Sequence, residues 1–271
     1  ISAGSLRGVA HVGVIQALEN AGFPIDVVAG TSMGAVVGSV YASGMPLKKI
    51  WEFAAALKVG SGNDLSATRL VSLLLFDKLL SSEKTETTLR EAIGGVRFDQ
   101  MPKPFACVAM DVYTGEAVIF RDGDVASAVR ASMNLPGLFR PIEYRHRFLV
   151  DGGVVDFIPV DAARLLGAQW TIASVTETDY TAMRPQNVLE SLIQVIDIRG
   201  SYMSRQQRKM ADFVIEPAVG DIGMFEDHRL TESMEKGITA VSKNLNAAKE
   251  SLILASVSRL SEGWRSKGNS R

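Results

Sequence analysis

The stretch Ile25–Val37 reads IDVVAGTSMGAVV and joins a short β-branched run to a run of small and apolar residues at helical spacing. This order predicts a strand, a sharp turn and a helix, with Ser32 at the apex of the turn. Gly30 and Gly34 flank the apex, and because they lack side chains they let strand and helix approach each other closely. Free N–H groups and the helix dipole favour negative charge beside Ser32. The pattern Gly30–Gly34 therefore predicts a nucleophile elbow.

Composition bounds the kind of protein that carries this elbow. The chain has 271 residues, 46% of them hydrophobic and 22% charged, with a formal net charge of −1. This length suits one large α/β domain or two small ones, and the near-neutral charge gives no reason to expect a nucleic acid as partner. Cys107 is the single cysteine, which excludes an internal disulfide and a zinc site built on paired cysteines. Its apolar neighbours predict that it is buried in a strand.

The compartment stays open at this stage. No apolar run reaches the roughly 18 residues of a membrane span. One cysteine suits the cytosol without excluding the periplasm. The chain starts at Ile1, inside an element, so a signal or anchor further upstream would not be visible. A cytoplasmic or peripheral membrane location is favoured, and a periplasmic or secreted one is not excluded.

A loop rich in glycine and serine, Ser2–Gly8, precedes the elbow and leads into an apolar helix over 9–18. A small-residue loop that opens a helix is an anion cradle, because its backbone N–H groups converge on one point. The elbow strand follows directly. We therefore expect the loop and Ser32 to lie on neighbouring strands of a parallel sheet.

The rest of the chain alternates strands and helices. Two hairpins are expected, Phe105–Met110 with Ala117–Phe120 and Ile142–Tyr144 with Arg147–Val150. Further strands are expected over 170–175 and 213–216, and helices over 33–44, 47–57, 85–93, 125–132, 160–166, 186–211 and 231–260. This alternation predicts an α/β fold in three layers, α/β/α, with a mostly parallel central sheet in a single domain over 1–271.

A serine nucleophile needs a base, and the chain has three histidines. His11 lies inside the first helix and is expected to be a packing residue. His146 lies at a hairpin tip and is expected to be solvated. His228 completes the order Ser…Asp…His of an ordinary triad, although its charged stretch lacks a strand end to position it.

Asp151 is the other candidate base. It follows the strand Arg147–Val150, which places it at an edge of the sheet where α/β proteins bind ligands. A carboxylate that accepts directly from the hydroxyl of Ser32 can serve as general base. The alternative interpretation is a simple Asp-Gly turn, since Asp151 precedes Gly152 and Gly153.

Taken together, these motifs resemble those of the patatin-like phospholipases. The resemblance rests on Gly4-Ser-Leu-Arg-Gly8, Gly30-Thr-Ser-Met-Gly34 and Asp151-Gly-Gly153, in this order. Further similarity lies in Ala10–Val14, in Ala131–Pro141 and in Ile158–Val160, so the matching part covers about 1–175 and a helical part follows over about 186–271. The resemblance implies a lipid acyl hydrolase, a serine carboxylic-ester hydrolase with a Ser-Asp dyad and no histidine.

The same resemblance implies a role for each motif residue. Ser32 would be the nucleophile and Asp151 its base, with an acyl-enzyme as intermediate. The backbone N–H groups of Gly4, Ser5 and Leu6 would form the oxyanion hole, which Arg7 would brace. The supporting residues are Arg7, Gly8, Gly30, Gly34, Gly152 and Gly153. This scheme requires no metal and no cofactor.

Two departures from the family pattern are visible. Ala3 and Ser5 stand where the family often has glycines, although backbone donors survive both changes. Asp156-Phe157 stands where the family often has Asn-Pro. A second carboxylate close to Asp151 would raise its pKa, and we expect Asp156 to point elsewhere.

The implied substrate is a phospholipid or related ester, with peripheral contact to a membrane. The apolar run Leu70–Leu80 is interpreted as a core helix or, alternatively, as a lid or acyl-chain wall. The basic residues over 199–209 would face anionic headgroups, and the helix from Thr231 would pack on its own domain or on a second copy. Two rival hypotheses remain, a His-dependent serine esterase and a non-enzymatic lipid-binding or regulatory module.

Overall fold

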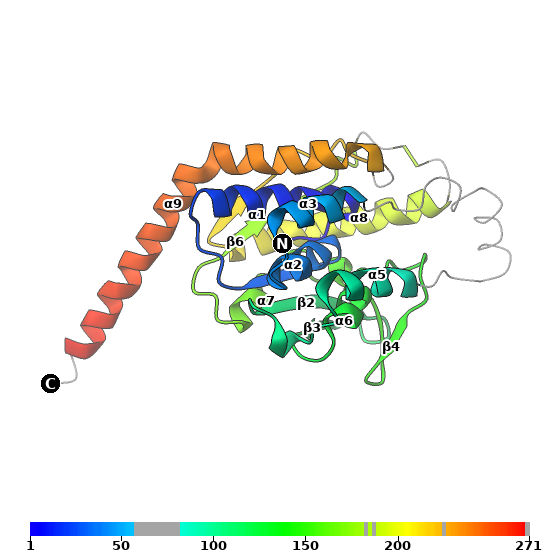
Figure 1. Cartoon of the computed structure of the whole chain (residues 1–271), viewed down its shortest axis with the longest axis horizontal. Helices are drawn as coiled ribbons and strands as arrows, with labels where there is room; N and C mark the ends of the chain where they lie inside the picture. Colours follow the sequence, from blue (N-terminus) through cyan, green and yellow to red (C-terminus); the bar gives the residue numbers. More distant parts are fainter. Residues whose placement is uncertain (57–81, 182–183, 186–187, 224–225, 269–271) are drawn as a thin grey trace.

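The computed structural model in Figure 1 describes residues 1–56, 82–181, 184–185, 188–223 and 226–268. The expected run Leu70–Leu80 lies outside these residues. Within them, no helix is both long and apolar enough to cross a membrane.

The main sheet has five strands. They are β1 (Val28–Thr31), β2 (Phe105–Asp111), β3 (Ala117–Phe120), β4 (Ile142–Tyr144) and β5 (Arg147–Asp151). β1 pairs with β2 in parallel, while β3 and β5 pair with β2 and β4 pairs with β5 in the antiparallel sense. Both predicted hairpins, β2–β3 and β4–β5, are confirmed.

A second, parallel pair, β6 (Ile172–Ser174) and β7 (Phe213–Ile215), is joined to the main sheet through the first residues of the chain. The nitrogen of Ile1 donates to the oxygen of Ala29 at 2.9 Å, and the nitrogen of Thr31 donates to the oxygen of Ile1 at 3.3 Å. On the other side, the nitrogen of Ser2 donates to the oxygen of Ser174 at 3.0 Å. The backbone at Ile1 and Ser2 thus lies between β1 and β6.

The α/β class is confirmed, and one part of the prediction is wrong: the main sheet is mixed, not mostly parallel. Two hairpins necessarily contribute antiparallel pairs, and β5 adds a third by pairing with β2 rather than beginning a crossover. The partner of β5 lies about 40 residues upstream, so no local pattern reveals this pairing.

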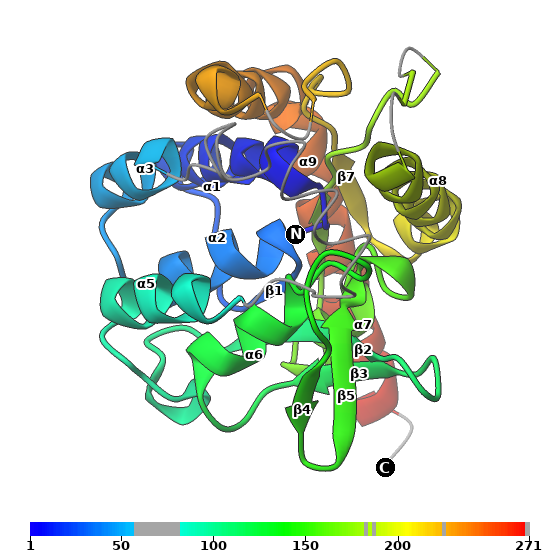
Figure 2. The same cartoon turned by 90° about the vertical axis from the view of Figure 1, so that its right-hand side faces the viewer.

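Helices cover both faces of the sheet (Figure 2). On β1 and β2, Val28, Phe105 and Cys107 face the core that contains α2 and α6, whereas Ala29 and Ala106 face α7. Cys107 is buried in a strand, as predicted.

The helices are α1 (Ala10–Asn20), α2 (Met33–Ala42), α3 (Leu47–Ala56), α5 (Glu83–Ile93), α6 (Val125–Ser132), α7 (Val160–Leu165), α8 (Val188–Gln207) and α9 (Leu230–Gly268). Short 3-10 turns are η1 (Ser5–Val9), η2 (Phe98–Gln100), η3 (Gly152–Val154), η4 (Arg208–Met210) and η5 (Asp227–Arg229).

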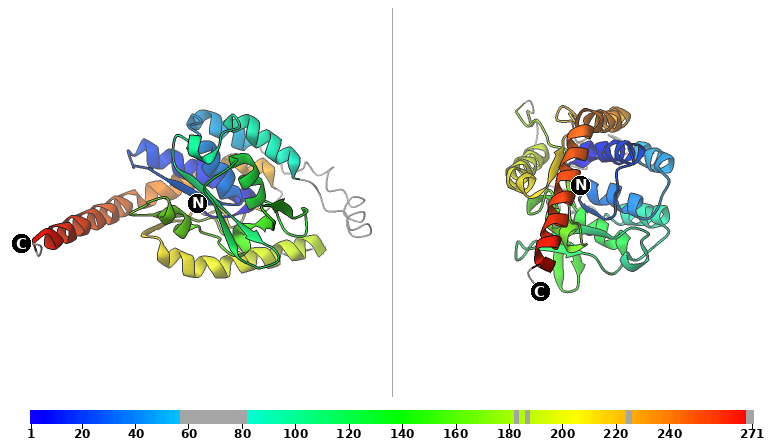
Figure 3. Two further views of the ribbon diagram at one scale, coloured as in Figure 1. Left: turned by 90° about the horizontal axis from the view of Figure 1, so that it is seen from below. Right: turned by 90° about the vertical axis from the view of Figure 1, so that its left-hand side faces the viewer.

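The first half of α9 packs along α1, contacts with the body continue as far as Arg259, and the C-terminal end of the helix extends away from the body (Figures 1 and 3). Two glycines allow the close contact between α1 and α9. A Cβ on Gly13 would lie 1.9 Å from the oxygen of Met234, and a Cβ on Gly237 would lie 2.1 Å from the oxygen of Ala10. The two backbones therefore touch, and no larger residue fits at either position.

Candidate active site

Ser32 occupies the strained turn that the sequence predicts, between β1 and α2. Its backbone has φ 55° and ψ −122°, a region that residues with a side chain rarely adopt. A Cβ on Gly30 would lie 2.2 Å from the oxygen of Gly34, and a Cβ on Gly34 would lie 2.4 Å from the oxygen of Ser2. The two glycines are therefore required by the close packing of strand, helix and upstream loop around Ser32.

The structure brings Ser32 and Asp151 together. Ser32 Oγ donates to Asp151 Oδ2 at 2.6 Å, and the N–H of Gly153 donates to Asp151 Oδ1 at 2.7 Å. Asp151 is 5% exposed, while Ser32 is half-buried. Each carboxylate oxygen thus has a donor, and the carboxylate is oriented toward the serine from a site almost closed to water.

The environment makes Asp151 a stronger base than an exposed aspartate. Burial raises its pKa to about 6, the hydrogen bonds from Ser32 and Gly153 oppose this rise, and the charge of Asp197 adds to it. The carboxylate is therefore ionised at neutral pH and accepts a proton more readily than an ordinary aspartate does.

The register of the sheet explains why these two residues meet. β1 and β5 both pair with the edge of β2 opposite β3, and they run toward each other along it. Thr31 pairs with Val108 at the end of β1, and Asp151 pairs with Ala109 at the end of β5. The carboxyl ends of the two strands thus abut, which places Ser32 beside Asp151.

The upstream loop lies against this junction. Among the groups that the structure describes, the N–H groups of Gly4, Ser5 and Leu6 donate to no other protein atom. A Cβ on Gly4 would lie 2.1 Å from Thr176 Oγ1, so this position accepts only glycine. Ser5 has φ 49°, a backbone conformation that favours glycine. Serine in place of the glycine that the family often has here therefore adopts a strained backbone. The loop therefore offers free donors at the start of η1.

The remaining motif glycines allow the loop, the elbow and Asp151 to lie in contact. A Cβ on Gly8 would lie 2.7 Å from Met33 Cγ, and a Cβ on Gly152 would lie 2.3 Å from the oxygen of Val108. A Cβ on Gly153 would lie 3.1 Å from the carboxylate of Asp151. These glycines serve the packing of the site.

Arg7 is held by residues for which the sequence suggested no role. Its side chain is buried, and Nη2 donates to Asp197 Oδ2 at 2.9 Å while Nη1 donates to the oxygen of Ile222 at 3.1 Å. The hydroxyl of Ser233 donates to the backbone oxygen of Arg7 at 3.1 Å. All three partners lie more than 180 residues downstream, so no local pattern could have identified them.

Ser132 and Asn134 are two further residues of the candidate site that sequence reasoning missed. The N–H of Ser32 donates to Ser132 Oγ at 2.9 Å, and the N–H of Asp151 donates to the oxygen of Asn134 at 2.9 Å. Ser132 at the end of α6 and Asn134 just after it thus hold the backbones of Ser32 and Asp151. Both residues lie in Ala131–Pro141, a segment that resembles the family. This resemblance is the signal that could have identified them, although it assigns no role to either residue.

The histidines lie away from Ser32. His11 is buried, its Nδ1 lies 2.7 Å from Ser174 Oγ, and burial lowers its pKa to about 3, so it is a neutral packing residue as predicted. His146 and His228 are exposed, and neither forms a hydrogen bond with Ser32 or Asp151 among the described contacts.

Asp156 has partners other than Ser32 and Asp151. Its Oδ1 accepts from Gln207 Nε2 at 2.9 Å, and its backbone oxygen accepts from Thr31 Oγ1 at 2.9 Å. Burial, followed by the charge of Asp161, raises the pKa of Asp156 to about 6. The carboxylate is thus anchored to the end of α8 rather than to Ser32.

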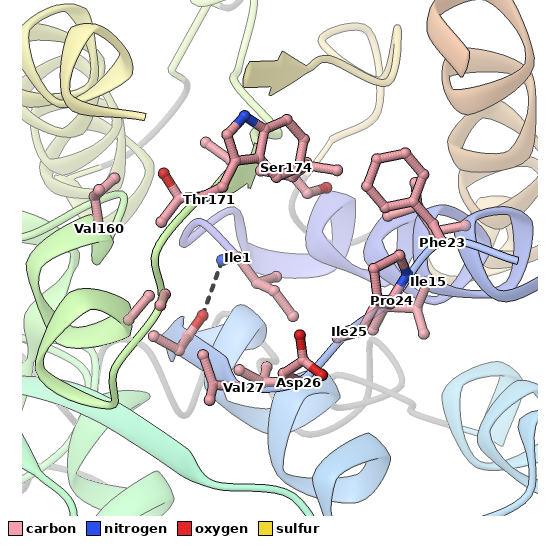
Figure 4. Close-up of a pocket in the computed structure, with 18 of the residues that line it drawn as sticks. Ile1, Ile15, Phe23, Pro24, Ile25, Asp26, Val27, Val160, Thr171 and Ser174 are labelled. Atoms are coloured by element: carbon pink, nitrogen blue, oxygen red, sulfur yellow. Dashed lines mark hydrogen bonds between the residues drawn. The ribbon is translucent and has the colours of Figure 1, made fainter. Parts of the chain in front are cut away.

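A cavity of about 430 Å³ lies at the opposite end of β1 (Figure 4). Its walls come from Phe23–Val28, from the end of α1, from α7 and from β6, and the labelled Ile1 and Thr171 face into it. Neither Ser32 nor Asp151 lines it, so it is separate from the candidate active site. Over the part of the chain that the structure describes, no group of three or more His, Cys, Asp or Glu could hold a metal ion.

Comparisons with known proteins identify the family of this chain. The family model described as "Patatin-like phospholipase" matches residues 1–164. An uncharacterized NTE family protein of Mycobacterium tuberculosis is 38% identical over 179 residues, which is 64% of this chain and 47% of that protein. The lysophospholipase NTE1 of Saccharomyces cerevisiae is 31% identical over 175 residues, 64% of this chain and 10% of that protein. The chain thus spans about half the length, or less, of these relatives.

Two solved structures share the fold. VipD from Legionella pneumophila aligns with a TM-score of 0.53 and 13% identity, over 91% of this chain and 66% of its own. The type III effector protein ExoU aligns with a TM-score of 0.51 and 16% identity, over 91% of this chain and 52% of its own. At this identity, the two structures support the α/β architecture and no finer statement.

Proposed function

Because the chain belongs to the patatin-like phospholipase family, we propose that it is a lipid acyl hydrolase that cleaves ester bonds of phospholipids or related lipids. In this proposal Ser32 is the nucleophile and Asp151 is its base. The single observation that carries it is the 2.6 Å hydrogen bond from Ser32 Oγ to the buried carboxylate of Asp151. The domain is the whole chain, since residues beyond 164 hold the loop of backbone donors.

The reaction has two steps. Ser32 Oγ attacks the carbonyl carbon of the ester while its proton passes to Asp151 Oδ2, and the N–H groups of Gly4, Ser5 and Leu6 stabilise the negative oxygen. When the carbon–oxygen bond to the alcohol breaks, Asp151 returns the proton to the leaving oxygen. A water molecule then attacks the acyl-enzyme and its proton passes to Asp151. Asp151 gives this proton to Ser32 Oγ as the bond between Oγ and the acyl carbon breaks, so the fatty acid leaves and both residues are restored.

The rival with a histidine base has less support. His228 is exposed in η5. The neighbouring Arg229 forms ion pairs with Asp221 and Glu226, and among the described contacts His228 has none with the elbow. A non-catalytic lipid-binding module is the second rival. The free donors of the loop, the strained Ser32 and the raised pKa of Asp151 together favour an enzyme, because a binding module requires none of these.

Contact with a lipid surface is part of the proposal. α8 and the distal part of α9 expose large apolar side chains, which suit peripheral contact or association of two copies. The exposed residues are Val188, Leu192, Val195 and Tyr202 on α8, and Ile253, Leu254, Val257 and Leu260 on α9. Sedimentation with phospholipid vesicles and light scattering distinguish these two outcomes.

A hydrolysis profile over lipid classes tests the proposal. Wild type should release fatty acid from at least one phospholipid or lysophospholipid, and both Ser32→Ala and Asp151→Asn should lose about 10³-fold or more of that rate. His228→Asn should retain it. A fluorophosphonate should label wild type at one site and leave Ser32→Ala unlabelled. Loss of activity in His228→Asn with retention in Asp151→Asn would establish the rival triad.

A further inference from the structure

We propose that Asp197 of α8 is a positioning residue for ester hydrolysis, because it holds the loop of backbone donors in place through the buried Arg7. This inference rests on the proposed function and extends it beyond residue 164, where the match to the family ends. It assigns to the C-terminal part of the chain a direct share in the geometry of the oxyanion hole.

The argument starts from the burial of Arg7. Its side chain is 1% exposed, and a guanidinium that has left water needs a counter-charge and hydrogen bonds to remain buried. Asp197 supplies the counter-charge at 2.9 Å, and Ile222 supplies a carbonyl oxygen at 3.1 Å. Asp197 is therefore the group that keeps Arg7 inside the protein.

Asp197 is itself fixed. Its Oδ2 also accepts from Thr178 Oγ1 at 2.9 Å, and its side chain is 12% exposed. On the buried side of α8, a Cβ on Gly200 would lie 2.7 Å from the ring of Phe157, so the helix lies tightly against the body. The carboxylate is thus presented to Arg7 from a rigid position.

The loop has little freedom once Arg7 is held. Arg7 directly follows Leu6 in η1, and Ser233 of α9 donates to the backbone oxygen of Arg7. Side chain and backbone of Arg7 are therefore both anchored within one turn of the three N–H donors. Without Asp197 the guanidinium would be left buried and unpaired, and it would move toward water and take η1 with it.

Asp197 also acts on the base through space. Its negative charge is one of the causes that raise the pKa of Asp151. Substitution of a residue that only supports the fold would leave the pKa of Asp151 unchanged. The pH of the acidic limb therefore measures the effect of the Asp197 charge, and thermal unfolding measures its effect on stability.

The experiment compares Asp197→Asn, Asp197→Glu and the control Glu216→Gln, which removes the charge from a 2.6 Å ion pair with Arg208 in the same part of the chain. Each variant is assayed with p-nitrophenyl butyrate over pH 4.5–8.5, and its thermal unfolding is recorded. Asp197→Asn should lower kcat about 10- to 100-fold with KM within about threefold, because the donors act on the transition state.

The acidic limb gives the second readout. Asp197→Asn should shift the acidic limb to lower pH. Asp197→Glu should return the limb to the wild-type pH and recover part of kcat. Glu216→Gln should equal wild type in the position of the limb and in kcat. The fluorophosphonate reaction rate should fall in parallel with kcat.

The inference and the proposed function fail in different ways. An inactive wild type, or an active Ser32→Ala, would refute the function. If wild type is active and Ser32→Ala is not, a folded Asp197→Asn with unchanged kcat and unchanged acidic limb would refute the positioning role alone. Should Asp197→Asn not fold, Thr178→Val decides, since it loosens Asp197 without removing the charge: a kcat equal to that of wild type would overturn the inference.

Discussion

Ser132 holds Ser32 by its backbone: the N–H of Ser32 donates to Ser132 Oγ at 2.9 Å, and the same hydroxyl donates to the oxygen of Val108 at 2.6 Å. The strained backbone of Ser32 is thus tied to the central strand β2 by one buried side chain. This contact spans 100 residues of sequence and joins the end of α6 to the start of α2.

Ser132→Ala should lower kcat/KM at least about tenfold and destabilise the fold by about 1–3 kcal/mol. The physical reason is that a buried N–H and a buried carbonyl both lose their partner. Ester hydrolysis and urea unfolding measure the two effects. The matched control is Ser39→Ala in α2, whose hydroxyl donates to the oxygen of Val36 within the helix. Equal losses of activity in both variants would contradict the assigned contact.

The pH profile of kcat/KM should have an acidic limb near pH 6, set by Asp151. Below this pH the carboxylate is protonated and no longer accepts the proton of Ser32, so the rate should fall about tenfold for each further pH unit. Asp156 has a similarly raised pKa and lies outside the dyad. Asp156→Asn should therefore leave the acidic limb at the same pH. If the limb shifts in that variant, it reports the titration of Asp156 and the assignment to Asp151 is wrong.

Asp156→Asn should raise the thermal unfolding temperature at pH 7.5 and leave it nearly unchanged at pH 4. Burial raises the folded-state pKa of Asp156 from 3.8 to about 6, so between these values the folded state binds more protons than the unfolded state. Stability from this group is therefore lost as pH rises through that window, and roughly 1–3 kcal/mol is at stake. The asparagine oxygen still accepts from Gln207. A variant that is less stable than wild type at pH 7.5 would contradict the burial argument.

Gly237→Ala should destabilise the fold by about 2 kcal/mol or more. In an open helix the same change stabilises by up to about 1 kcal/mol, but here the new Cβ would lie 2.1 Å from the oxygen of Ala10. Ala247→Gly, at an exposed position of α9, measures the intrinsic difference in the same helix. Chemical unfolding of both variants checks the sign, and a stabilised Gly237→Ala would show that α1 and α9 do not touch.

The local elements of the site could be predicted because their chemistry is local. The strand, the turn at Ser32 and the helix follow from one short stretch, and the loop at Gly4–Gly8 follows from its small residues. The loop and the turn also resemble the motifs of the patatin-like phospholipases, and the match of the family model to residues 1–164 confirms that the chain belongs to this family. The catalytic roles remain predictions.

The long-range part could not be predicted. The direction of β5 depends on its pairing with β2, and an aspartate such as Asp197 looks like any other acidic residue of a polar helix until the fold places it beside Arg7. Ser132 is likewise one serine among many. These residues act through contacts across 100 to 190 positions of the chain, and such contacts leave no local pattern.

The bracing of Arg7 has a consequence for biosynthesis. Ser32 and Asp151 leave the ribosome well before Asp197, Ile222 and Ser233, so the two residues can come together in a nascent chain whose donor loop is still unanchored. Closing a loop of more than 180 residues is also entropically slow. If the proposed hydrolysis holds, the competent loop is therefore completed late, after translation of the C-terminal helices.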